Sequence, residues 1–156
     1  MDPIIAAARG LATDAFDVLR RAATGLSADA LDWEPAGPDT NSIAVLATHS
    51  LNATRLLMSL AVGLDQPARD RDAEFEATSG GADRLLGLID EISGECLAIL
   101  DEAPHDIDWS QLRDLQRADG STTQRPAAFF IVHAVDHLRG HADEASLTRH
   151  VWEART

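Results

Sequence analysis

Three histidines are the residues of this chain whose types and spacing are best suited to chemistry. His49 lies in one apolar stretch, and His137 and His141 stand four residues apart in another. Four-residue spacing places two side chains on one face of a helix, about one turn apart. Two histidines of one helix and a third from a packed neighbour are a known way to hold a divalent metal ion with coordination positions left open. We therefore predict a metal site at His49, His137 and His141.

The competing interpretation is that each imidazole is an ordinary core side chain. A buried histidine needs a hydrogen-bond partner, which a nearby backbone or side-chain group usually supplies. Two histidines on one core face need two such partners, and a third on another buried face needs one more. A single metal ion would satisfy all three, and this favours the metal site.

Two further residues extend this group along the same segment. His133 precedes His137 by four residues, toward the edge of the core face, and we interpret it as lining the pocket or moving protons. Glu144 follows His141 by three residues and could accept a hydrogen bond from a ligand, bind the ion weakly or act as a general base. Each also has a simpler interpretation, as a boundary residue in contact with water.

The composition excludes several classes of function. The chain has 26 acidic and 13 basic residues, a net charge of −13, and neither lysine nor tyrosine. An acidic chain repels phosphate backbones, so we expect no nucleic-acid partner. Without lysine, Schiff-base chemistry and a Walker-type phosphate loop are excluded. Histidines, carboxylates, hydroxyls and a metal ion remain for chemistry on a small-molecule substrate.

The length and the cysteine count set the expected class of protein. With 156 residues the chain suits one domain, residues 1–156, that buries a real core. Its apolar runs stop short of the ~20 residues that a membrane span requires. A single cysteine allows no internal disulfide and suits a reducing compartment. The acidic start has no basic leader region, so we expect a cytoplasmic protein with no membrane partner.

Hydrophobic periodicity predicts four long helices and no strand. The second helix has a narrow polar arc and should be buried nearly all round, whereas the first should bury a seam that includes Ile4 and Leu11. Four amphipathic helices predict an all-α fold, a four-helix bundle. The expected helices run from Pro3 to Thr24, from Asn41 or Ser42 to Gly63 or Leu64, from Ala82 to Glu102, and from near Thr123–Pro126 to the C-terminal region.

Long irregular stretches separate these helices. Residues 65–81 form a polar loop, and Pro104–Arg125 could close over the site as a lid, with one short helix around Trp109 and Leu115. Cys96 falls in an apolar stripe, which indicates a small core residue rather than a nucleophile. Trp33, in the loop after the first helix, is interpreted as a packing plug.

Two groups of motifs resemble those of the DinB-like (damage-inducible) superfamily. The resemblance covers nearly the whole chain in helix order and spacing, and it implies a four-helix bundle. It also implies a divalent ion, zinc or nickel first and iron as a further option, held by His49, His137 and His141. The family often follows the last ligand with Arg-Gly-Gln, where this chain has Ala142-Asp143-Glu144. The matching motifs are Trp33-Glu34-Pro35, Asn41-Ser42-Ile43-Ala44 with His49, and the run His133, His137, His141.

Three functions remain open at this point. The resemblance implies a metal-dependent thiol transferase of the mycothiol or bacillithiol type, with a low-molecular-weight thiol as cosubstrate and Glu144 or His133 moving protons. The same three ligands would serve a metal-dependent hydrolase. A non-enzymatic, stress-related metal-binding protein is the third hypothesis. The acidic surface with an apolar seam also allows a homodimer.

Overall fold

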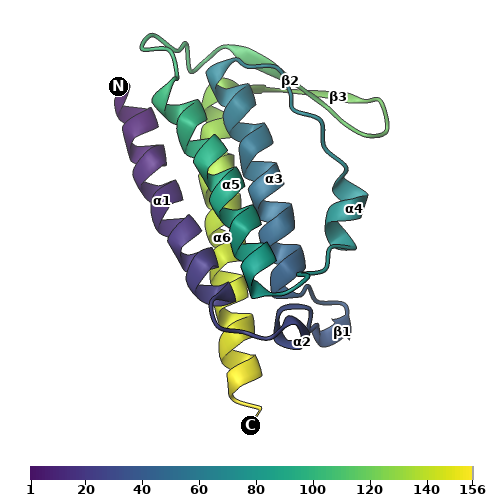
Figure 1. The fold of residues 1–156 in the computed structure, drawn as a ribbon. Helices are drawn as coiled ribbons and strands as arrows, with labels where there is room; N and C mark the ends of the chain where they lie inside the picture. The colour runs from purple at the N-terminus through teal and green to yellow at the C-terminus, as the bar shows by residue number, and fades with distance from the viewer. Residues whose placement is uncertain (156) are drawn as a thin grey trace.

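Four long helices lie side by side in the computed structural model, which describes residues 1–155 (Figure 1). Helices α1 and α6 run in one direction, and α3 and α5 run in the other (Figure 1). The predicted four-helix bundle is confirmed. No helix in the described part of the chain has the length and apolar character needed to cross a membrane. The long helices are α1 (Pro3–Ala23), α3 (Ile43–Val62), α5 (Ala82–Asp101) and α6 (Ala127–Glu153).

Helix α3 is the central element of the core. Apart from Thr48, Asn52 and Arg55, all of its residues are buried, as the narrow polar arc predicted. The Ser42 side chain caps its first turn by accepting a hydrogen bond from the Val45 backbone N–H. The helix ends at Val62, and the following Gly63 caps it with a φ of +87°, the left-handed conformation that glycine adopts at low cost. These two caps fix the position of His49 within a fully packed helix.

The predicted seam of α1 is wrong in part. Ile4 and Leu11 are 41% and 57% exposed, whereas Phe16 and Leu19 are buried. The many alanines of α1 make its apolar face broad, so small residues alone do not show which edge of that face meets the core. Large side chains that fill space between helices decide the orientation, because close packing leaves few voids.

Three short elements occupy the connections at one end and one side of the bundle. α2 (Ala28–Leu31) and β1 (Pro35–Pro38) lie between α1 and α3, and α4 (Arg71–Phe75) lies in the long crossover that leads from α3 to α5 (Figure 1). Trp33 makes an edge contact with the Trp152 ring, with the Arg155 guanidinium over both rings. Trp33 is therefore a packing residue.

The expectation of no strand is also wrong. β2 (Leu112–Gln116) and β3 (Thr122–Pro126) form an antiparallel hairpin between α5 and α6. Its turn contains Asp119-Gly120, whose glycine has a φ of +80°. An Asp-Gly pair between two short strands is a strong hairpin signal, and it outweighs helical spacing over so few residues. Trp109 and Leu115 pack against the core without forming the expected helix.

Cys96 is a core residue, as its place in the apolar stripe indicated, and this has a measurable consequence. It is fully buried in α5, and burial raises the pKa of its thiol to about 12. The thiolate is the reactive form, so about one molecule in 10⁴ is reactive at pH 8 in the native state. We expect iodoacetamide to modify the native protein at least about 100-fold more slowly than the urea-unfolded protein. Equal rates, measured by mass spectrometry, would contradict this assignment.

Candidate metal centre

The packing of α3 against α6 brings the three predicted histidines together. His49 projects from α3 toward His137 and His141 on α6, and the ring centroids of each pair lie 4.5–5.2 Å apart. One nitrogen from each ring can be chosen so that all three atoms lie within 4.8 Å of one another. Four-residue spacing accounts for the pair on α6, whereas only helix packing places His49 against it. The triad could therefore bind a metal ion.

The donor atoms fit the dimensions of a small divalent ion. His49 Nε2 and His137 Nε2 are 3.2 Å apart. Zinc–imidazole bonds of about 2.0–2.1 Å in a tetrahedral site place two nitrogens about 3.3 Å from each other. His141 Nδ1 is hydrogen-bonded to Glu144, which leaves the Nε2 atom of His141 available. Three imidazole donors without a thiolate suit zinc, nickel, iron or copper.

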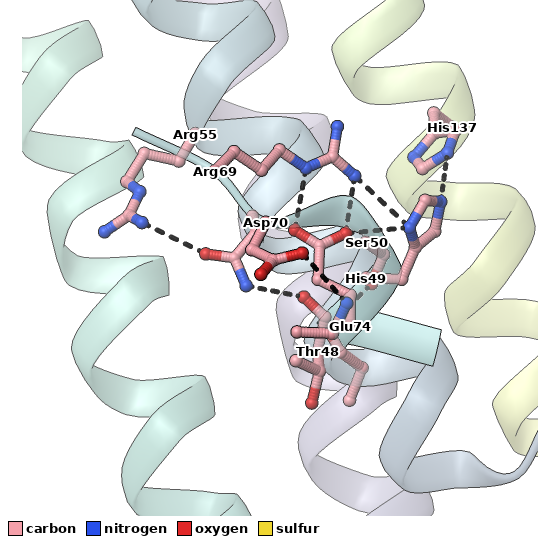
Figure 2. Close-up of polar contacts among 11 residues, drawn as sticks. Thr48, His49, Ser50, Arg55, Arg69, Asp70, Glu74 and His137 are labelled. Atoms are coloured by element: carbon pink, nitrogen blue, oxygen red, sulfur yellow. Dashed lines mark hydrogen bonds and ion pairs between the residues drawn. The ribbon is translucent and has the colours of Figure 1, made fainter. Parts of the chain in front are cut away.

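Glu74 and Arg69, both from the crossover, orient the His49 ring (Figure 2). His49 Nδ1 lies 3.0 Å from Glu74 Oε2 and 3.2 Å from Arg69 Nη2, and the Arg69 guanidinium donates to both oxygens of the Glu74 carboxylate over 2.7 Å each. Burial alone would raise the pKa of Glu74, but the hydrogen bonds from His49 and Arg69 and the charge of Arg69 lower it overall. The carboxylate therefore stays ionised and holds the proton on His49 Nδ1, which directs the Nε2 lone pair into the cluster.

His137 is the most constrained of the three histidines. Burial, together with repulsion from the neighbouring histidines, lowers its pKa to about 3, so its ring is neutral at physiological pH. Because the His49 Nε2 atom carries a lone pair, the His137 Nε2–H donates to it in the metal-free protein. A bound ion would need both lone pairs, so the His137 proton would move to Nδ1. That atom is buried and has no hydrogen-bond partner within the described residues.

Comparison with known proteins identifies the family of this chain. The model of the DinB superfamily matches residues 12–145. The chain belongs to the DinB superfamily. A crystal structure described as the conserved protein of a locus from Enterococcus faecalis matches this DinB-superfamily chain with a TM-score of 0.72, over 97% of both chains and at 14% identity. That likeness supports the fold alone. No curated protein sequence is detectably similar to the chain.

Glu144 and His133 lie beside the three histidines of this DinB-superfamily protein. Glu144 Oε2 is 3.1 Å from His141 Nδ1, so the glutamate occupies the position of a hydrogen-bond acceptor for that histidine. Its side chain is 46% exposed and can exchange protons with water. The His133 ring is in edge contact with His137 at 5.7 Å, outside the group of three converging donors. Neither residue belongs to the group of three converging donors.

Sequence reasoning missed Glu74 and Arg69. The crossover at residues 65–81 has no periodicity, and its polar residues are typical of an exposed loop. A histidine that binds a metal usually donates a hydrogen bond from its second ring nitrogen, so an acceptor for His49 was to be expected. The sequence offered 26 acidic residues as that acceptor and did not single out one of them. Only the path of the crossover along α3 selects Glu74.

Proposed function

We propose that this protein is a metal-dependent thiol S-transferase that joins a low-molecular-weight thiol to an electrophilic small molecule. The observation that carries the proposal is the convergence of three imidazoles with no anionic side chain among them. Neutral ligands leave the full charge of a divalent ion in place, and three of them leave coordination positions open. Zinc and nickel are the first candidates for the ion, and iron is the next.

The residues around the triad would each have a defined task in that reaction. A bound divalent ion would supply a positive charge that favours the thiolate form of the cosubstrate. The His141 side chain is 24% exposed and that of His49 is 9% exposed, so a thiol would approach the cluster past His141. Glu144 would accept the thiol proton, and His133 is the second group placed to transfer protons. The sulfur would then form a bond to the electrophilic carbon, whose leaving group would depart with its electron pair.

One chain supplies every residue that the proposed reaction needs. All three histidines, Glu144 and Glu74 come from the same polypeptide, so activity would not require the homodimer that the exposed Ile4 and Leu11 of α1 would allow. A single domain and a cytoplasmic location, where small thiols stay reduced, are parts of the same proposal.

Conjugation of a thiol to an electrophile tests this function. We expect the zinc- or nickel-loaded protein to accelerate reaction of a small thiol with 1-chloro-2,4-dinitrobenzene, and the chelator-treated protein to lose this activity. A thiol panel and a parallel panel of esters and amides should be measured by absorbance. Full activity of the metal-free protein would contradict the proposal, and turnover of esters alone would favour a hydrolase instead.

A further inference from the structure

Two exposed aromatic side chains lie against histidines of this region, one against His49 of the triad and one against the neighbouring His133. Phe75 of α4 lies against the His49 ring, with centroids 4.6 Å apart. Phe129 of α6 is stacked on His133 at 5.4 Å and 26°. Phe75 and Phe129 are 38% and 45% exposed, although large aromatic side chains usually bury most of their surface. Exposed rings beside a cluster of convergent polar groups are typical of the walls of a small-molecule site.

An arginine side chain lies over each of these rings. The Arg71 guanidinium lies over the Phe75 ring, 4.8 Å from its centroid, and that of Arg125 lies over Phe129 at 5.8 Å. A guanidinium placed over a ring still presents its N–H donors at its edge, in a geometry that matches a carboxylate. Neither arginine forms an ion pair within residues 1–155, whereas Arg69 is fully engaged by Glu74. Arg125 uses Nη1 for a hydrogen bond to the Gln124 carbonyl oxygen, so both arginines keep other donors available beside Phe75 and Phe129.

Unpaired guanidinium groups lie beside the cluster, although the chain as a whole is acidic. The protein carries a net charge of −13, so an organic anion is repelled at long range. At His49, Arg69 neutralises Glu74. The other carboxylates of residues 70–76 offset the charge of Arg71, but none of them forms an ion pair with it within the described residues. An anionic ligand would therefore be favoured by direct contact with the guanidinium groups of Arg71 and Arg125, not by the net charge of the surroundings.

We infer that the site takes a small organic anion, a carboxylate attached to an apolar body. The apolar body would pack against Phe75 and Phe129, and the carboxylate would bind the guanidinium groups of Arg71 and Arg125. This inference rests on the proposed function, because it names the class of the thiol or electrophile that the site would accept. It assigns to α4 and to the end of β3 a role in selecting the substrate.

A probe without a thiol tests the inference separately from catalysis. Binding of 3-phenylpropionate, and of its neutral analogue 3-phenylpropionamide, should be measured by calorimetry on the zinc-loaded protein. We expect the carboxylate to bind more tightly, and R71Q and R125Q each to weaken it about threefold to tenfold, with little effect on the amide. R21Q is the matched control, since Arg21 is an exposed arginine of α1.

The outcomes separate this inference from the proposed function. Equal binding of acid and amide, no binding to the wild-type protein, unchanged affinity in R71Q and R125Q, or an equal loss in R21Q would each overturn the inference. Unchanged affinity in both variants would show that the carboxylate binds the metal ion alone. If conjugation is absent but the probe binds as expected, the proposed reaction fails while the anion site stands. Where conjugation occurs, KM for a carboxylate-bearing thiol should rise in both variants with kcat unchanged.

Discussion

Replacing His137 by alanine is expected to remove most of the metal-dependent stabilisation and the proposed activity. At a free metal concentration about 1,000 times Kd, binding raises the free energy of unfolding by about 4.1 kcal/mol. Loss of an outer hydrogen bond to a ligand weakens binding about 10- to 100-fold, and loss of the ligand itself should cost at least as much. A 100-fold weaker site would retain only about 1.4 kcal/mol of stabilisation at the same concentration. Thermal or urea unfolding with and without metal measures this difference.

In the metal-free form, the H137A substitution should cost little stability, in contrast to its large effect on the metal-bound form. His137 Nδ1 is buried without a partner, and such an atom costs about 1–3 kcal/mol. The metal-free variant should therefore lose less stability than a core truncation normally does. His150, an exposed histidine on the same helix, gives the matched control H150A, which should keep full metal binding. Metal-dependent stabilisation equal to that of wild type in H137A would contradict the assignment of the ligand.

Replacing Glu74 by glutamine is expected to have the second-largest effect. The Glu74 side chain is 5% exposed and that of Arg69 is 18% exposed, so the substitution leaves a largely buried guanidinium without its anion. Breaking one partner of a buried pair costs on the order of 3–5 kcal/mol. The glutamine side chain of the variant also no longer holds the proton on His49 Nδ1. Affinity for the metal should therefore fall about 10- to 100-fold. Urea unfolding measures the loss of stability, and metal titration measures the loss of affinity for the metal.

The pH dependence of this effect has a definite sign. The pKa of Glu74 is lower in the folded protein than its ordinary value of 4.5, so the folded state favours the ionised carboxylate. The stabilisation is therefore fully present above about pH 4.5 and is lost as the pH falls through the lower folded pKa. The difference in free energy of unfolding between wild type and E74Q should be constant near neutral pH and shrink below pH 4.5. Unfolding curves from pH 3 to pH 7 measure it.

A double substitution shows whether the ion pair is the cause. R69Q/E74Q removes both charges, so it should be more stable than E74Q alone, because no unpaired buried guanidinium remains. E76Q, at an exposed position of the same crossover, is the control and should behave as wild type. If E74Q unfolds and binds metal as wild type does, Glu74 has no role in orienting His49.

The parts of the site that lie on single helices were predictable from spacing. His137, His141 and His133 share one side of α6 because residues three or four apart in a helix are neighbours. The burial of His49 followed from the narrow polar arc of α3. The preference of asparagine and serine for helix caps left Asn41 or Ser42 as the start of that helix, and the structure uses Ser42. The hairpin was missed because helical spacing was applied to a stretch too short to show a period, where the Asp-Gly turn was the stronger signal.

The amino-acid sequence by itself determined the four helices, the helix faces that carry His49, His137 and His141, and the acidic net charge. These properties are local, because they depend on periodicity and composition within one segment. The tertiary structure alone decided that His49 Nε2 lies 3.2 Å from His137 Nε2, that Glu74 and Arg69 reach His49, and that Phe75 packs against the His49 ring. Those contacts join residues far apart in the chain, and their formation depends on the path of the crossover and the angle of helix packing, which no local pattern encodes.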